Sequence, residues 1–116
     1  MLYLSEARKY FLYRGITDMR KSFNGLSGLV RQELHREPLS GEVFVFLSRR
    51  RSQIRLLLWE GDGFSIYSKR LEKGTFELPT DMDETKEIKC DDLLFLLKGI
   101  KLSSVEKRKR FSLNNR

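Results

Sequence analysis

Carboxylates are the residues of this sequence with the most direct route to catalysis. A metal-dependent nuclease or transposase uses a cluster of them to hold two metal ions about 4 Å apart. The carboxylates available for such a cluster are Asp18, Glu60, Asp62, Glu72, Asp81, Asp83 and Glu84. Asp62 is required in a turn, Asp18 suits a helix cap, and the last three lie in a loop outside any rigid element. The pattern therefore predicts neither a metal site nor a catalytic carboxylate.

Histidine and cysteine chemistry is equally limited. His35 is the only histidine and Cys90 the only cysteine, which excludes an internal disulfide and a thiolate-rich zinc site. A nucleophilic thiol needs a base beside it, and the sequence gives no reason to place His35 there. A single cysteine also suits a reducing cytosol. We therefore expect Cys90 to be structural, and the protein to act without catalytic residues or cofactors.

Basic side chains offer binding chemistry in place of catalysis. Three consecutive arginines follow the apolar run at residues 42–48, and three guanidinium groups in one turn cannot all pack inward. Lysine and arginine contact phosphates, so this cluster and two other basic runs predict a DNA-binding surface. The residues expected to contact DNA are Arg49, Arg50, Arg51, Lys69, Arg70, Lys107, Arg108, Lys109 and Arg110.

Charge is segregated along the chain, whose formal net charge is +7. Residues 1–58 carry 11 Lys/Arg against 5 Asp/Glu, residues 59–97 carry 5 against 10, and residues 98–116 carry 7 against 1. Segregated positive charge concentrates nucleic acid by long-range attraction. The alternative is that these side chains form a solvated surface and a basic tail that keep the protein soluble.

The length of 116 residues suits one domain, and a composition of 40% hydrophobic and 34% charged residues is typical of a globular protein. No apolar run approaches the roughly 20 residues that span a bilayer, and the N-terminus lacks the features of a secretory signal. We therefore expect a cytoplasmic protein with no membrane partner. Residues 1–101 are expected to form a single α+β domain, followed by a basic tail at residues 102–116.

The segment at residues 53–79 must organise the fold, because it contains the strongest hairpin signal. Asp62 lies between glycines that separate two runs rich in aromatic and apolar residues. A turn at Gly61-Asp62 pairs Trp59 with Phe64, whereas a turn at Asp62-Gly63 pairs Trp59 with Ile66. Both registers divide the hairpin residues into the same two faces. One face holds Arg55, Leu57, Trp59, Phe64, Ile66 and Ser68, and the other holds Ile54, Leu56, Leu58, Ser65, Tyr67 and Lys69.

These two faces allow two interpretations. If the Trp59 face alone is buried, Tyr67 and Lys69 stay near the surface as a platform on which nucleic-acid bases can stack. Alternatively, Leu56 and Leu58 also need cover, and the sheet is then buried on both sides.

Two helices are expected to cover the sheet. Apolar residues at helical spacing predict a long N-terminal helix after residue 15, with Thr17 or Asp18 as its cap. Its apolar stripe is Met19, Phe23, Leu26, Val30 and Leu34. A short helix is expected at residues 93–98, capped by Asp91 or Asp92.

Strands are expected at residues 9–14, 42–48, 75–78 and 87–89, in addition to the hairpin. The nearly unbroken apolar run at residues 42–48 is typical of a central strand that is covered on both faces. Short connections between the later strands predict an antiparallel β-meander. The predicted fold is therefore α+β: a meander sheet with one long N-terminal helix and a short C-terminal helix packed on one face.

Four blocks of the sequence resemble, in order, those of a family of small transposon proteins. The first block, GITDMRKSFNGL at residues 15–26, resembles G-x-T-D-M-R-K-G-F-D-G-L. The later blocks are SGEVFVF at 40–46, WEGDG at 59–63 and YSKRLEKGTF at 67–76. On these motifs the chain resembles the TnpB-like accessory proteins, second open-reading-frame products of the insertion sequence sixty-six family of bacterial mobile elements. It departs from the pattern at Asn24, Leu58 and Leu78.

The resemblance implies an accessory protein for DNA transposition, encoded beside a larger transposase that carries the catalytic acids. It supplies no catalytic residues to carry over. The expected partners are DNA and the element-encoded transposase. The protein is expected to bind DNA through its basic residues. The alternative is an adaptor that docks on the transposase without DNA, through the sheet or through Asp18, Arg20 and Lys21.

Overall fold

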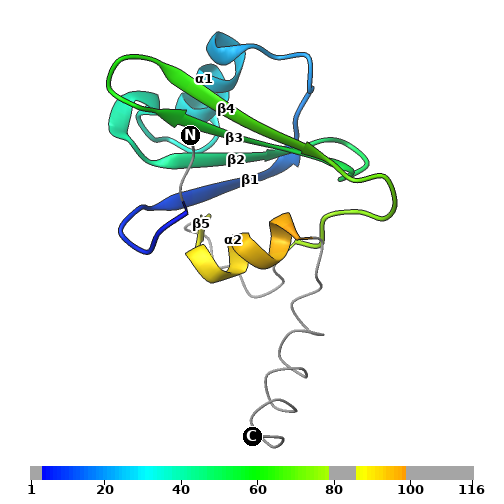
Figure 1. Cartoon of the computed structure of the whole chain (residues 1–116). Coiled ribbons are helices and arrows are strands. Elements are labelled where there is room, and N and C mark those ends of the chain that lie inside the picture. Colours follow the sequence, from blue (N-terminus) through cyan, green and yellow to red (C-terminus); the bar gives the residue numbers. More distant parts are fainter. Residues whose placement is uncertain (1–3, 79–85, 99–116) are drawn as a thin grey trace, which may run out of the picture.

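The computed structural model describes residues 4–78 and 86–98 (Figure 1). Its elements, in chain order, are β1 (Tyr10–Ile16), α1 (Phe23–Gln32), the short 3₁₀ helix η1 (Pro38–Ser40), β2 (Val43–Leu47), β3 (Gln53–Trp59), β4 (Phe64–Arg70), β5 (Glu87–Ile88) and α2 (Cys90–Leu97). The fold class is α+β, as expected. The basic tail expected at residues 102–116 lies outside the described residues.

The strands form one five-stranded mixed sheet in the order β4-β3-β2-β1-β5. β1 and β2 are parallel, and every other neighbouring pair is antiparallel. The predicted antiparallel meander is therefore wrong. Parallel neighbours need a crossover connection, and here α1 lies in that crossover. The short connections between the later strands did indicate correctly that β2, β3 and β4 form an antiparallel meander.

The first helix is short, and the predicted long N-terminal helix is also wrong. β1 extends through Ile16, and the Thr17 amide donates to the Leu47 carbonyl. The carboxylate of Asp18 then accepts a hydrogen bond from the Arg20 amide at 2.9 Å, while the Asp18 carbonyl accepts one from the Lys21 amide at 3.1 Å. A side chain that bonds the backbone two residues on favours a turn over a helix. This turn ends before α1, whose N-cap is Ser22.

Apolar side chains cover both faces of the sheet, in agreement with the second interpretation of the hairpin. α1 and α2 lie on opposite sides of the sheet in Figure 1, which corrects the prediction of helices on one face. On the α1 face, the buried residues are Phe11, Leu26, Val30, Leu34, Phe44, Phe46 and Leu57. On the α2 face, they are Tyr10, Leu12, Val43, Val45, Leu47, Ile54, Leu56, Leu58, Phe76, Ile88, Leu93 and Leu96. β2 is buried along its whole length, as expected of a central strand.

The hairpin adopts the first of its two possible registers, with Trp59 opposite Phe64. Gly61 takes a φ of +95°, and Asp62 keeps a negative φ. Positive φ at the first central position alone matches a type II′ turn, which favours glycine there. The turn forms at Gly61-Asp62 because glycine readily adopts the positive φ that its first central position requires.

The segment after β4 is not the strand predicted at residues 75–78. The Leu71 amide donates to the Ser52 carbonyl at 2.8 Å, and the Phe76 amide donates to the Arg51 carbonyl at 2.7 Å. Phe76 is fully buried on the α2 face. This segment therefore crosses the end of the sheet to place one aromatic ring in the core.

The last two predicted elements are present. β5 is a two-residue edge strand beside β1. α2 begins earlier than expected, at Cys90, and its N-cap is Lys89, which makes no side-chain cap. Asp91 and Asp92 lie in the first turn instead, where their charges favour the helix dipole.

Candidate nucleic-acid interface

The turn between β2 and β3 presents the three consecutive arginines. Arg49, Arg50 and Arg51 are all exposed. Ser48 holds the turn closed: its carbonyl accepts from the Arg51 amide at 2.9 Å, and its hydroxyl accepts from the Gln53 amide at 3.0 Å. Arg51 has a φ of +57°, in the left-handed region. Because the backbone is bonded on both sides of the turn, the guanidinium groups project from a fixed base.

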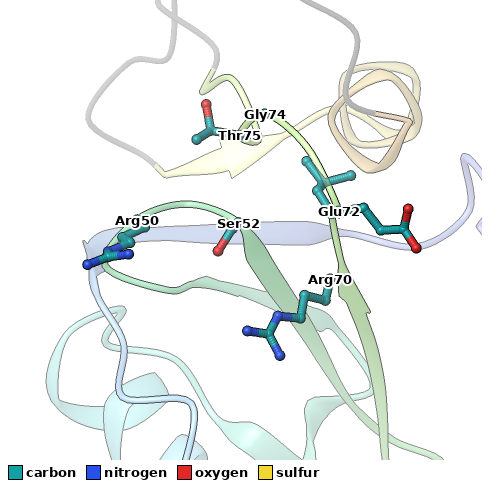
Figure 2. Close-up of a pocket in the computed structure, with 7 residues that line it drawn as sticks. Arg50, Ser52, Arg70, Glu72, Gly74 and Thr75 are labelled. Atoms are coloured by element: carbon teal, nitrogen blue, oxygen red, sulfur yellow. The ribbon is translucent and has the colours of Figure 1, made fainter.

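Arg70, at the end of β4, lies beside this turn because it pairs with Gln53 at the start of β3. Together the turn and the segment after β4 enclose an open pocket of about 730 Å³. Its lining residues are Arg50, Ser52, Arg70, Leu71, Glu72, Gly74 and Thr75, drawn in Figure 2. The fold thus brings Arg50 and Arg70, from separate basic runs, to one site.

Backbone hydrogen bonds hold the two sides of the pocket together. The bonds from Leu71 to Ser52 and from Phe76 to Arg51 tie the segment after β4 to the turn at two points. The lining side chains include two guanidinium groups, one carboxylate from Glu72, and hydroxyls at positions 52 and 75. Guanidinium and hydroxyl donors suit anionic oxygens, and the lining keeps a positive excess. The arrangement can bind an anionic group such as a phosphate.

Lys69 does not join this site. It lies on the α2 face, whereas Arg70 lies on the α1 face, since side chains alternate along a strand. The Lys69 ammonium is half-buried and donates to the Leu97 carbonyl at 2.7 Å, at the end of α2. Lysine beside the last carbonyls of a helix is favourable for the helix dipole. The other expected contacts, Lys107, Arg108, Lys109 and Arg110, lie outside the described residues.

The expected partner-binding residues form the turn before α1. The Arg20 guanidinium donates to both carboxylate oxygens of Asp18, with the shortest contact at 2.8 Å. The hydrogen bonds from Arg20 hold the pKa of Asp18 down at about 2. The Lys21 carbonyl accepts a hydrogen bond from Arg55 at 3.0 Å, which ties the turn to β3. Asp18 and Arg20 thus form a closed ion pair on the surface.

The family model described as "IS66 Orf2 like protein" matches residues 8–107. The chain belongs to the IS66 Orf2-like family. That family associates it with transposition by insertion sequences of the IS66 type, as the sequence motifs indicated.

Two relatives of this family member come from Sinorhizobium fredii (strain NBRC 101917 / NGR234), and both are described as uncharacterized. The protein y4jC is 31% identical over 91 residues, which cover 78% of each chain. The protein y4hO is 34% identical over 92 residues, which cover 79% of this chain and 80% of the relative. No solved structure matches.

Sequence reasoning missed several surface residues of this IS66 Orf2-like chain. Ser52, Glu72 and Thr75 line the pocket, yet only the hydrogen bonds of the fold reveal this. Ile16 was assigned to a helix start, but 64% of its surface is exposed, and 43% of Phe23 is exposed on the other side of the Asp18 turn. Alternation along β1 places Ile16 on the same face as the buried residues Tyr10 and Leu12, so the strand pattern gave no sign that Ile16 lies outside the core.

The candidate metal ligands do not come together in the described part of this family member. Within residues 4–78 and 86–98, no group of three His, Cys, Asp or Glu side chains is placed to hold a metal ion. Asp81, Asp83 and Glu84 lie outside that part. Among the same described residues, no helix is long and apolar enough to cross a membrane.

Proposed function

We propose that this IS66 Orf2-like protein is a non-catalytic accessory factor for transposition, and that it binds DNA through Arg49, Arg50, Arg51 and Arg70. The observation that supports this most directly is the pocket that Arg50 and Arg70 line together from separate elements. Exposed arginines on a fixed turn and at the end of a neighbouring strand form one basic surface. Lys69 is left out, because its ammonium is bonded to α2.

The chemistry of this surface favours contacts with the phosphate backbone. Arginine presents a planar fork of donors that matches two phosphate oxygens at once. Arg49 and Arg51 flank Arg50 on the turn, so a phosphate at the pocket has further guanidinium groups within the same short segment. Phosphate contacts fix the position of a protein on a duplex without reading its sequence. Sequence preference, where present, then comes from the separate transposase or from DNA shape.

Fluorescence anisotropy with a labelled duplex across a salt series tests this proposal. Each neutralised phosphate adds about −0.9 to the slope of log affinity against log salt concentration. We expect wild-type protein to show a steep slope, and Arg50→Ala/Arg70→Ala to flatten it by about 2. The matched control is Arg20→Ala/Arg31→Ala, which removes the same charge from exposed side chains elsewhere and should leave most of the slope unchanged.

The outcomes separate the possible roles. Tighter binding to duplex from the terminal repeats of the element than to random duplex identifies a DNA-end recognition factor. Equal binding to both identifies a general DNA-binding accessory. If the two double variants flatten the slope equally, DNA binding is diffuse and the pocket is not its site. Absence of binding at low salt contradicts the proposal.

A second candidate function, an adaptor for the transposase, is favoured by a separate surface. Ile16 lies just before the turn that the Asp18–Arg20 ion pair closes, and 64% of its surface is exposed. Exposed apolar side chains rimmed by charged residues are typical of protein interfaces. If this surface docks on the transposase, Ile16→Glu should abolish a complex that forms without DNA and survives high salt. Leu39→Glu, the same kind of change at another exposed apolar residue, should not.

A further inference from the structure

The two edges of the sheet differ in how well they are protected. One edge is β5, which has only two residues and leaves little backbone to pair. The other edge is β4, which has seven residues, and its pairing with β3 shows no bulge. Its first five residues, 64–68, carry no charge and no proline. Natural proteins usually protect an edge strand with charge, proline, a bulge or short length, and this stretch has none of these.

The hydrogen bonds to β3 reveal which backbone groups of β4 point outward. The Glu60 amide donates to the Gly63 carbonyl, and the Leu71 amide donates to the Ser52 carbonyl. With the register of the two strands, these bonds show that the backbone amides and carbonyls of the odd-numbered residues of β4 point toward β3. In an antiparallel pair the bonded residues alternate along the strand. The amides and carbonyls that point away from β3 therefore belong to Phe64, Ile66, Ser68 and Arg70. Within residues 4–78 and 86–98, β4 has no second neighbouring strand, and these groups make no backbone hydrogen bond outside the sheet.

We propose that this edge binds a second copy of the chain, by antiparallel pairing of β4 with β4 about a two-fold axis at Ile66. An antiparallel edge is complementary to itself, because each outward amide meets an outward carbonyl of the other copy. In this register Phe64 pairs with Ser68 and Ile66 pairs with Ile66, and all these residues offer outward backbone groups. The two sheets then form one continuous sheet.

The distribution of charge favours pairing about Ile66, and it favours a second copy of the chain as the partner. β4 carries positive charge only at its end, on Lys69 and Arg70, and Asp62 lies just before its start. Pairing about Ile66 brings Arg70, at the end of each β4, toward Asp62 in the hairpin turn of the other copy, so opposite charges meet at both ends of the interface. A register about Ser68 instead places each Lys69 next to the axis, only two positions from Lys69 of the other copy, and like charges across strands are unfavourable. The strand therefore complements its own copy best in the Ile66 register.

Sedimentation equilibrium of the full chain, at protein concentrations from about 1 to 100 µM, tests the dimer. We expect a dimer for wild-type protein. Ser68→Pro removes an amide that β3 does not use, so it should abolish the dimer and preserve the circular-dichroism spectrum. Ser68→Ala keeps the amide and should remain dimeric. A monomeric wild type, or a dimer that Ser68→Pro leaves intact, overturns the proposal.

A charge exchange tests the register and distinguishes a second copy from another partner. In Asp62→Arg every Arg70 faces an arginine, and in Arg70→Asp every Asp62 faces an aspartate, so each variant alone should be monomeric. An equimolar mixture restores both opposite-charge pairs in a heterodimer, and we expect a dimer to return. If both variants are monomeric and the mixture stays monomeric, the Ile66 register is wrong and the proposal fails. If both variants remain dimeric, the proposal fails as well.

Discussion

The ammonium of Lys69 donates a hydrogen bond of 2.7 Å to the carbonyl oxygen of Leu97, and so joins the end of β4 to the end of α2. The bond links two elements that are separated in sequence by the crossing segment and β5. It also explains why adjacent residues have different roles. Lys69 faces α2, while Arg70 lines the pocket.

Removing the Lys69 ammonium should destabilise the protein. We expect Lys69→Met to lower the free energy of unfolding by about 1 kcal/mol, because the carbonyl of Leu97 loses a charged donor at a helix C-terminus. Urea denaturation measures the difference. Lys73→Met, a change of the same charge at an exposed position, is the control and should have little effect. Equal stability of the two variants would show that the bond contributes nothing.

The ion pair between Asp18 and Arg20 should be visible in a titration. The pKa of Asp18 is about 2 in the folded protein, below its usual 3.8, because Arg20 donates hydrogen bonds to the carboxylate. The contribution of Asp18 to stability is thus present above pH 3.8 and lost as the pH falls toward 2. In Arg20→Met, NMR of the carboxyl carbon should show the pKa of Asp18 rising toward 3.8. The control Arg31→Met should leave it at about 2.

Arg36 should not tolerate replacement by lysine. Its guanidinium donates two hydrogen bonds to Glu42, at 2.8 and 2.7 Å, and lies 4.0 Å from the centre of the Phe11 ring. A lysine loses both the forked geometry and the stacking. Because the arginine is partly exposed, we expect Arg36→Lys to cost only about 1 kcal/mol of unfolding free energy.

The control for this substitution is Arg31→Lys. Arg31 pairs with Glu37 at 3.5 Å, and both side chains are largely exposed. Its replacement should change the urea midpoint very little. A similar loss in both variants would mean that charge at the surface, rather than the geometry around Arg36, sets the effect.

Phe76 should be important for stability although it belongs to no strand or helix. Its ring is fully buried, and large-to-small changes of buried aromatics cost about 3 kcal/mol or more. We expect Phe76→Ala to lose about this much stability in urea denaturation. Phe23→Ala, at a ring that is 43% exposed and stacks on Phe64, should lose clearly less. The opposite ranking would contradict the placement of Phe76 in the core.

Local patterns in the sequence predicted the local features of the fold. Alternation across β3 and β4 assigned every hairpin residue to its face, because the period of a strand is independent of the turn register. The unbroken apolar run of β2 predicted its burial, because both faces of such a strand need apolar cover. Arg49, Arg50 and Arg51 were predicted at the surface because no turn can bury three guanidinium groups.

These local patterns could not predict which strands pair with each other, or in which direction. Nothing in the residues of β1 specifies that it lies parallel to β2, since that choice depends on the path of the crossover. The spacing of Met19 and Phe23 fits a helix, but the side-chain hydrogen bond of Asp18 competes with helix formation there. The pocket needs the same non-local information, because Arg50 and Arg70 meet only when β4 pairs with β3.

The pairing of Tyr10 with Ile88 and of Phe11 with Glu87 has a consequence for synthesis on the ribosome. β1 is made first, but its outer neighbour β5 is made only after β4 is complete. Leu93 and Leu96, which complete the core on the α2 face, follow later still. A nascent chain that ends before β5 leaves one side of β1 and one face of the sheet uncovered. Such a chain presents apolar surface to chaperones and proteases until its last helix emerges.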